Sequence, residues 1–290
     1  MMTGKTIRSY LALGKVKIAF FASLSAAAGL LLANRPQGGV LPALTAGVFL
    51  LAGGACALNQ YQERDSDALM ARTAGRPIPG GRVSPGRALC FSLVLIGSGS
   101  FVLFFTDSLA APLLGLAAVF WYNGVYTRMK SRSAFAAIPG ALVGAVPPAI
   151  GWMAGGGRLC DPALLALCFF FFMWQVPHFL VHLLAFGKEY EAIGRPSLTA
   201  VFTEAQLGRL VFQWLFAAAV SLQLIIVHGL IRSPVVLIAL LSVSFWLAAM
   251  GIPLLREGAS LYPRVFKRIN WFMLAVMLLL FLDKFPARLG

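Results

Sequence analysis

The sequence predicts an all-α membrane protein, a single domain over residues 1–290 with about nine transmembrane helices around a central cavity open to the cytoplasmic face. Composition is the first reason. Hydrophobic residues make up 59% of the chain and charged residues only 12%, whereas soluble domains average about 25% charged residues. The second reason is patterning, because the mean hydropathy of +0.83 is concentrated in runs near the ~20 residues that cross a bilayer. A backbone in lipid must satisfy its own hydrogen bonds, so these runs are expected to be helices.

The expected spans are separated by segments that carry most of the charged residues. They cover approximately residues 17–34, 40–60, 87–106, 109–127, 135–154, 162–185, 208–229, 234–254 and 269–286. A cleaved signal peptide is an alternative for the first run, since four basic residues precede it: Lys5, Arg8, Lys15 and Lys17. We favour a retained first helix, because many spans follow and the charge distribution agrees best when it is included.

The basic residues predict how the chain lies in the membrane. The net charge is +14, yet Lys and Arg flank the apolar runs instead of forming one patch, so nucleic acid is not an expected partner. With the N-terminus in the cytoplasm, 19 of the 24 Lys and Arg residues fall on the cytoplasmic side. The other five are Arg35, Arg158, Arg232, Lys284 and Arg288. The positive-inside rule therefore favours this orientation, in an inner (cytoplasmic) membrane.

The four cysteines do not indicate a disulfide framework or a zinc site. Cys56, Cys90, Cys160 and Cys168 show no CxxC spacing, and three of them fall in apolar runs. We expect them to be buried small apolar residues.

The acidic residues are concentrated in the two longest cytoplasmic segments, after the second and sixth spans. Six of the ten lie there: Glu63, Asp65, Asp67, Glu189, Glu191 and Glu204. Asn59, Glu63 and Asp67 recur every four residues, which places them on one helical face. Such an array of oxygen ligands suits Mg²⁺, which binds through a few carboxylates plus substrate phosphates. A solvated loop explains Glu191 and Glu204 adequately.

An ion-coupled transporter would place isolated acids in the middle of its spans. This chain instead gathers acids at one membrane face, together with basic residues. Lys130 and Arg132, between the fourth and fifth spans, could grip phosphate oxygens. Arg72 and Arg76 would lie at the rim of the same cavity, so transport is the weaker interpretation.

The stretch from Asn59 to Pro77 resembles the first aspartate-rich motif of the UbiA superfamily of intramembrane prenyltransferases. Its matching residues are Asn59, Glu63, Arg64, Asp65, Asp67, Met70, Arg72, Thr73, Arg76 and Pro77. Three further blocks follow in the order of that family: first Lys130, Ser133, Gly140, Gly144, Ala145, Pro147, Pro148, Gly151 and Trp152; then Trp174, Gln175, Pro177, His178 and Phe179; then Glu189, Tyr190, Gly194 and Pro196. Within the superfamily the pattern is most similar to the protoheme IX farnesyltransferases. Glu63 and Glu189 stand where those proteins have Asp, and Ser131 splits a Lys-Arg doublet.

The resemblance implies Mg²⁺-dependent transfer of a farnesyl group from farnesyl diphosphate to a vinyl group of haem b, giving haem O. The implied catalytic residues are Asn59, Glu63, Asp67, Lys130 and Glu189, and all of these except Lys130 would hold the metal. The implied substrate contacts are Arg72, Arg76, Tyr126, Arg132, His178 and Tyr190. Lipid surrounds such a protein, and haem A synthase or terminal oxidase assembly would be its partners. A quinone-precursor aromatic or a chlorophyll-type molecule is the alternative acceptor.

The predicted orientation can be tested with reporters fused after Arg132 and after Arg158. The charge distribution places these two positions on opposite sides of the membrane, with the first in the cytoplasm. Alkaline phosphatase should be inactive at the first position and active at the second. Equal activity at both positions would exclude this topology.

Overall fold

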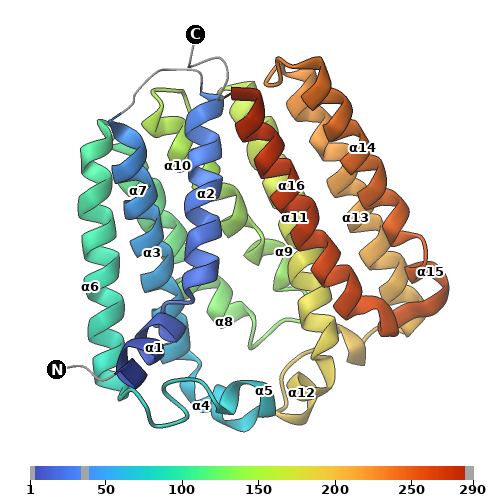
Figure 1. The fold of residues 1–290 in the computed structure, drawn as a ribbon. Helices are drawn as coiled ribbons and strands as arrows, with labels where there is room; N and C mark the ends of the chain where they lie inside the picture. Colours follow the sequence, from blue (N-terminus) through green and yellow to red (C-terminus); the bar gives the residue numbers. More distant parts are fainter. Residues whose placement is uncertain (1–3, 34–38, 285–290) are drawn as a thin grey trace.

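The structure, a computed structural model, describes residues 4–33 and 39–284, and every regular element in these ranges is a helix (Figure 1). The longer helices are α2 (Val16–Leu32), α3 (Val40–Gln62), α6 (Pro85–Leu103), α7 (Ala110–Val119), α10 (Leu142–Ala154), α11 (Pro162–Ala185), α13 (Glu204–Val227), α14 (Pro234–Gly251) and α16 (Tyr262–Lys284). The short ones are α1 (Gly4–Leu13), α4 (Arg64–Leu69), α5 (Ala71–Ala74), α8 (Thr127–Met129), α9 (Ala137–Gly140), α12 (Gly187–Ala192) and α15 (Leu254–Glu257). The expected all-α membrane fold is confirmed.

Within the described residues, seven helices are long and apolar enough to cross a membrane, and an eighth is added if α1 and α2, bent by 51°, form one span. The expected span at 109–127 is helical but divided. It consists of α7, a π-helix named η2 (Phe120–Tyr126), and α8. The count of nine therefore remains a prediction, and the last residues of the expected first and ninth spans lie outside the described ranges.

Three of the long helices begin at a proline. Helices α6, α11 and α14 start with Pro85, Pro162 and Pro234. Proline suits this position, because its missing N–H would have no partner there. The Asp161 and Ser233 side chains then accept hydrogen bonds from the free backbone N–H groups of the first turn.

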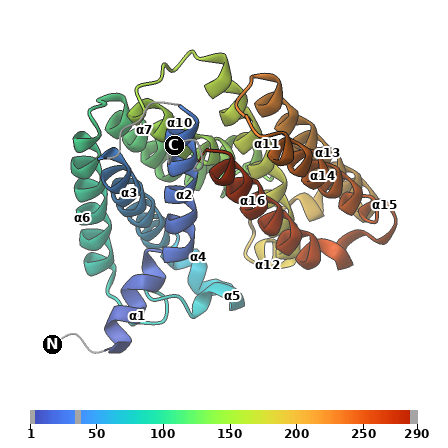
Figure 2. The ribbon, with the colours of Figure 1, turned by 45° about the horizontal axis from the view of Figure 1, so that its top comes forward.

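The long helices are arranged in a ring, which Figures 1 and 2 show from two directions. Helix α2 contacts α3, α10 and α16. On one side α3 packs on α6, and α10 packs on α7; on the other, α11, α13, α14 and α16 pack against one another. The short helices α4, α5, α8 and α12 gather at one end of the ring (Figure 1). We call this end the polar end, because it carries the acidic segments that the sequence singles out.

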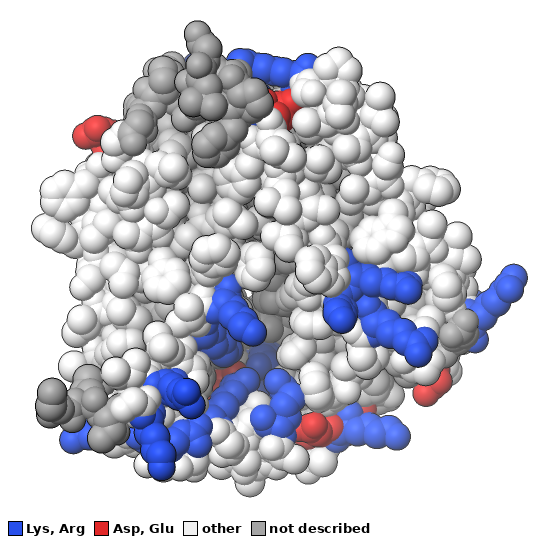
Figure 3. All heavy atoms as spheres, viewed as in Figure 1, with Lys and Arg blue, Asp and Glu red and all other residues white. Residues whose placement is uncertain are grey.

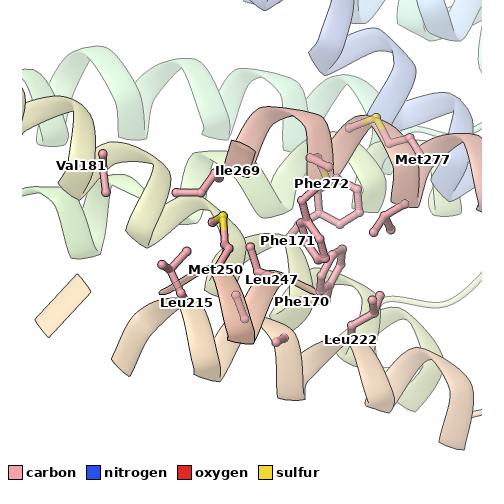
Figure 4. Close-up of a cluster of buried hydrophobic side chains, with 14 of the residues drawn as sticks. Phe170, Phe171, Val181, Leu215, Leu222, Leu247, Met250, Ile269, Phe272 and Met277 are labelled. Atoms are coloured by element: carbon pink, nitrogen blue, oxygen red, sulfur yellow. The ribbon is translucent and has the colours of Figure 1, made fainter. Parts of the chain in front are cut away.

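The largest hydrophobic cluster fills the space between α11, α13, α14 and α16 (Figure 4). Phe170, Phe171 and Phe272 are at most 1% exposed. Phe170 meets both other rings edge-on, with centroids 5.6 and 6.2 Å apart. These aromatic side chains pack against one another, so they serve the fold, and they hold α11 and α16 together behind the polar end.

The cysteines correct one expectation. Cys56 is buried and Cys168 is half-buried, but Cys90 and Cys160 are exposed. Cys90 lies on α6, and only 22% of the apolar stretch of that span is buried inside the protein. An apolar residue in a membrane protein can face lipid as well as the core, so hydrophobicity alone does not predict burial here.

Helices α2 and α10 approach so closely that two positions require glycine. A β-carbon added at Gly29 would overlap the backbone oxygen of Pro148, and one added at Gly151 would overlap that of Ala26. Small residues at such crossings let membrane helices pack backbone against backbone. This contact fixes α2 against the rest of the ring.

We expect Gly151→Ala to lower the free energy of unfolding by about 1–3 kcal/mol, because overpacking forces the two backbones apart. Gly97→Ala on α6 is the matched control, since no atom of the described part of the chain lies within 4 Å of its added β-carbon. It should be neutral or slightly stabilising, because alanine favours helices. Thermal unfolding in detergent measures both variants. Equal effects would show that the α2–α10 contact does not need its glycines.

Candidate active site

The candidate site lies at the polar end, where α3 passes into α4. Asn59, Glu63 and Asp67 are all less than 5% exposed. The Glu63 N–H donates to the Asn59 carbonyl at 2.9 Å, and the Asp67 N–H donates to the Glu63 carbonyl at 2.8 Å. Helical turns therefore link all three residues, although α3 itself ends at Gln62. Figure 3 shows Lys and Arg side chains gathered around a hollow in the same half of the molecule.

Glu63 is held by two cations from distant segments. Lys130 Nζ lies 3.1 Å from both oxygens of the carboxylate. Arg195 Nη1 donates to Glu63 Oε1 at 3.1 Å, and its Nη2 donates to Ser66 Oγ at 2.7 Å. The side chains of Lys130 and Arg195 are 17% and 15% exposed. One buried carboxylate thus joins the α3–α4 junction to the segments that follow α8 and α12.

The charges in this cluster stabilise one another in their ionised forms. Burial alone would raise the pKa of Glu63, but the ammonium of Lys130 and the guanidinium of Arg195 lower it to about 2. Burial alone would lower the pKa of Lys130, but the Glu63 carboxylate raises it above its ordinary value. Both groups are therefore charged at neutral pH.

Asp67 forms a second ion pair one turn further along. Arg76 Nη1 donates to Asp67 Oδ2 at 2.6 Å, and the Asp67 side chain is only 2% exposed. The Thr73 hydroxyl donates to the Asp67 carbonyl at 2.8 Å. Arg76 therefore reaches into the acidic cluster, beyond the rim position that the sequence suggested.

The acidic segment after α11 meets the first one through Glu189. The Arg72 backbone N–H lies 3.5 Å from Glu189 Oε2. The Arg72 guanidinium stacks 4.4 Å above the ring of Phe186, which immediately precedes α12. The structure thus brings both acidic segments to the same end of the ring.

Asn59 is connected to α8, the short helix that ends one residue before Lys130. Its Nδ2 donates to the Thr127 hydroxyl at 3.1 Å, and that hydroxyl donates to the Tyr122 carbonyl at 2.8 Å. Asn123, in the same π-helix, donates to the Ala55 carbonyl at 3.0 Å. Polar contacts therefore fix α3 against η2 at the level of the candidate site.

Two tyrosines flank Lys130. Its Nζ lies 5.7 Å from the centre of the Tyr190 ring, a side chain that is 5% exposed. Tyr126 is stacked between Tyr122 and Phe179, with centroids 5.6 and 5.7 Å away. The face of the Tyr190 ring can stabilise the Lys130 ammonium through a cation–π contact. The Tyr126 ring instead packs between α11 and η2.

The two histidines of α11 lie beside α16. The rings of His178 and His182 lie 4.9 and 5.4 Å from Phe266, and Trp174 lies 5.0 Å from His178. His178 Nδ1 is buried and, among the described residues, has no hydrogen-bond partner. These side chains form an aromatic wall that continues from the hydrophobic cluster toward the polar end.

The structure departs from the expected site in two respects. Arg132 is exposed and, within the described part of the chain, contacts none of the other candidate residues. Helix α8 ends at Met129, so Lys130 turns inward to Glu63 while Arg132, two residues later, turns outward. In addition, no three acids, histidines or cysteines of the described residues are grouped closely enough to hold a metal ion. The carboxylates of Glu63 and Asp67 instead form ion pairs with Lys130, Arg195 and Arg76.

Sequence reasoning missed three contributors. Arg195 and Ser66 were not singled out, because an arginine in a cytoplasmic loop looks like a topology signal. Thr127 was a further omission, although a polar residue next to an apolar span was a usable signal.

Comparisons with known proteins find similar sequences over most of the chain. The model of the UbiA prenyltransferase family matches residues 22–282. The protoheme IX farnesyltransferase of Geobacter sulfurreducens is 36% identical over 260 residues, covering 88% of this chain and 93% of that protein. The one of Oleidesulfovibrio alaskensis is 35% identical over 279 residues, covering 96% and 97%. That of Nitratidesulfovibrio vulgaris is 38% identical, and the match spans 61% of this chain and 62% of its relative.

Solved structures share the fold at low sequence identity. A digeranylgeranylglyceryl phosphate synthase is similar with a TM-score of 0.74 at 17% identity, over 96% of this chain and 98% of that one. A UbiA homologue from Archaeoglobus fulgidus bound to GPP and Mg²⁺ has a TM-score of 0.62 at 12% identity, over 92% and 99%. The agreement extends over nearly the whole chain.

The ion pairs of Glu63 make a prediction about pH. The folded pKa of about 2 lies below the ordinary value of 4.5, so the stabilisation is fully present above pH ~4.5 and is lost as the pH falls toward 2. Glu63→Gln leaves two buried cations without an anion, and we expect it to cost on the order of 3 kcal/mol of unfolding free energy near neutral pH. Thermal unfolding between pH 3 and 8 should show that the difference in stability between the wild type and Glu63→Gln becomes smaller toward pH 3.

Asp65→Asn is the matched control. The Asp65 carboxylate is 85% exposed, and its one ion pair, with Arg64 at 3.6 Å, is a surface pair. Such pairs contribute little to stability, so the loss of this one should change the unfolding free energy little. The assignment of the ion pairs would be contradicted if the stability lost in Glu63→Gln did not depend on pH, or if it equalled the loss in Asp65→Asn.

Proposed function

Since the chain belongs to the UbiA prenyltransferase family, we propose that it transfers a farnesyl group from farnesyl diphosphate to haem b, giving haem O. The observation that carries the proposal is the buried cluster of Glu63, Asp67, Lys130 and Arg76 at one end of the ring. A cluster with cations and anions in alternation can accept a metal-bound diphosphate without a large change in net charge. The similarity to protoheme IX farnesyltransferases over most of the chain supports haem b as the acceptor.

The proposed reaction is an electrophilic alkylation of a haem vinyl group by the allylic carbon of farnesyl diphosphate, followed by addition of water. The bond between this carbon and the diphosphate oxygen breaks, and the electron pair leaves with the diphosphate. The π electrons of a haem vinyl group form the new carbon–carbon bond. Water then adds to the remaining cationic carbon and releases a proton, which gives the hydroxyethylfarnesyl side chain.

The chain would promote this step by stabilising charge on the leaving group. Preorganised cations in a water-poor site are effective at this, because they need no rearrangement as charge develops. Lys130, Arg195 and Arg76 are the candidates, since each is already within 3.1 Å of a carboxylate oxygen at the site. A diphosphate entering between them would replace Glu63 and Asp67 as their anionic partner.

Asn59, Glu63 and Asp67 fit a hard divalent cation such as Mg²⁺. Their side chains offer oxygen ligands on successive turns of one helical face, and two of them are carboxylates. Glu189, near Arg72, is the proposed ligand from the second acidic segment. Mg²⁺ bound there would take up negative charge on the diphosphate. The cations that now hold the carboxylates would be free to bind phosphate oxygens.

The acceptor would lie beside the aromatic wall of α11 and α16. Trp174, His178 and Phe266 present flat faces there, which suits a planar macrocycle. The prenyl chain is apolar and would extend between helices toward lipid. We place the protein in the inner (cytoplasmic) membrane with its N-terminus and site on the cytoplasmic side, and its haem product would be delivered to haem A synthase or terminal oxidase assembly.

Incubation with farnesyl diphosphate and Mg²⁺ tests the proposal directly. Haem b and an aromatic hydroxy acid, a quinone precursor, should be offered separately, and the products read by mass spectrometry. We expect haem b to gain one farnesyl and one hydroxyl group. Farnesylation of the aromatic acid alone would retain the prenyltransferase assignment and reject the acceptor.

Lys130→Gln ties the reaction to the site. It should raise the KM for farnesyl diphosphate roughly 10- to 100-fold, the loss expected for one hydrogen bond to a charged group, while haem b binding is retained. Arg128→Gln is the control, because Arg128 lies in the same segment but, among the described residues, its guanidinium bonds only the Gly124 carbonyl. Unchanged kinetics of Lys130→Gln would place the diphosphate elsewhere.

A further inference from the structure

The contact between Asn59 and Thr127 joins two elements that the proposed chemistry requires. Asn59 lies on α3 with the acidic cluster, and Thr127 begins α8, three residues before Lys130. The Asn59 amide nitrogen and the Thr127 hydroxyl oxygen are 3.1 Å apart. The Asn59 side chain is 3% exposed, so its amide cannot rely on bulk water for hydrogen bonds.

The direction of each hydrogen bond follows from the next one in the chain. The Tyr122 carbonyl can only accept, so the Thr127 hydroxyl must donate its single proton to it, across 2.8 Å. The same hydroxyl then has only lone pairs left for Asn59. The Asn59 group that faces Thr127 must therefore be the NH₂ end. Its carbonyl oxygen points the opposite way.

The π-helix makes this arrangement possible. In η2 the Thr127 backbone N–H bonds the Tyr122 carbonyl five residues back, where an α-helix would use the carbonyl four residues back. The Thr127 hydroxyl bonds the same carbonyl, so both donors of one residue converge on Tyr122. The wider turn of η2 leads directly into α8, and Lys130 follows α8.

Neighbouring contacts hold the π-helix in register with α3. Asn123 Nδ2 donates to the Ala55 carbonyl at 3.0 Å and to Gln62 Oε1 at 3.1 Å. Gln62 Nε2 donates back to the Asn123 carbonyl at 3.1 Å. With two reciprocal side-chain contacts, α3 and η2 cannot slide past each other without breaking several buried hydrogen bonds.

We infer that Thr127 is a positioning residue for the proposed metal–diphosphate site: its hydroxyl fixes the Asn59 amide so that Oδ1 is presented to the cation. This inference rests on the proposed function, and it concerns only how the metal is held. Among the described residues no group donates a hydrogen bond to Asn59 Oδ1, which leaves that oxygen available as a ligand. Partners that orient a metal ligand commonly change metal affinity or activity by about 10- to 100-fold when removed.

The test compares Thr127→Val with Thr127→Ser. Valine keeps the shape but removes the hydroxyl, so the Asn59 amide loses its acceptor and can rotate. Serine keeps the hydroxyl. Mn²⁺ affinity, measured by electron paramagnetic resonance in the presence of inorganic diphosphate, should fall roughly 10- to 100-fold in Thr127→Val and stay close to wild type in Thr127→Ser. The KM for Mg²⁺ should rise in parallel, with haem b binding unchanged.

Thr106→Val is the matched control. Thr106 is fully buried, its hydroxyl also donates to a carbonyl, that of Leu103, and it lies beyond the far end of α6. It should affect stability without affecting Mn²⁺ binding. Wild-type Mn²⁺ affinity in Thr127→Val, or equal losses in the valine and serine variants, would overturn the inference. If the wild type binds Mn²⁺ but does not farnesylate haem b, the acceptor proposal fails while the role of Thr127 stands.

Discussion

A buried carboxylate stays ionised only if cations pair with it, and Glu63, which is 4% exposed, meets this requirement with two cations. An unpaired buried charge costs several kcal/mol. Lys130 and Arg195 therefore cannot be placed independently of Glu63, although they lie 67 and 132 residues away along the chain. The α3–α4 junction, the end of α8 and the loop after α12 are brought together by this one interaction.

The same interaction bears on the proposed binding of a metal and a diphosphate. In the absence of substrate, the carboxylates at Glu63 and Asp67 are neutralised by Lys130, Arg195 and Arg76, so they do not repel one another as an all-acidic site would. A metal and a diphosphate carry the complementary pair of charges. When they bind, the carboxylates would coordinate the metal, and the basic side chains would bind the phosphate oxygens. We call this the exchange of partners. We expect each ligand to favour binding of the other for this reason.

The sequence predicted the parts of this arrangement that depend on local spacing. The recurrence of Asn59, Glu63 and Asp67 every four residues predicted their shared helical face, and the apolar runs predicted the helices. It could not predict the partner of Glu63, because Arg195 looks the same as any positive-inside anchor until the chain is folded. Nor could it predict the different orientations of Lys130 and Arg132. Arg132 lies two residues from Lys130, yet the turn after α8 directs it to the outside.

Two further features depended on packing that spacing does not encode. Hydrophobicity did not distinguish Cys56, which faces the core, from Cys90, which is exposed, because lipid accepts apolar side chains as readily as the protein interior does. The π-helix at η2 was also not predicted. Its contacts with α3 include the Asn123 hydrogen bonds to the Ala55 carbonyl and the Gln62 side chain, which join residues far apart in the sequence.

The exchange of partners at Glu63 can be measured as coupling between metal and diphosphate. Mn²⁺ affinity should be determined by electron paramagnetic resonance with and without farnesyl thiodiphosphate, an analogue that resists ionisation. Coupling energies between sites are typically about 1–3 kcal/mol, so Mn²⁺ should bind about 5- to 150-fold more tightly when the analogue is present. Equal Mn²⁺ affinity with and without the analogue would contradict the exchange of partners at Glu63.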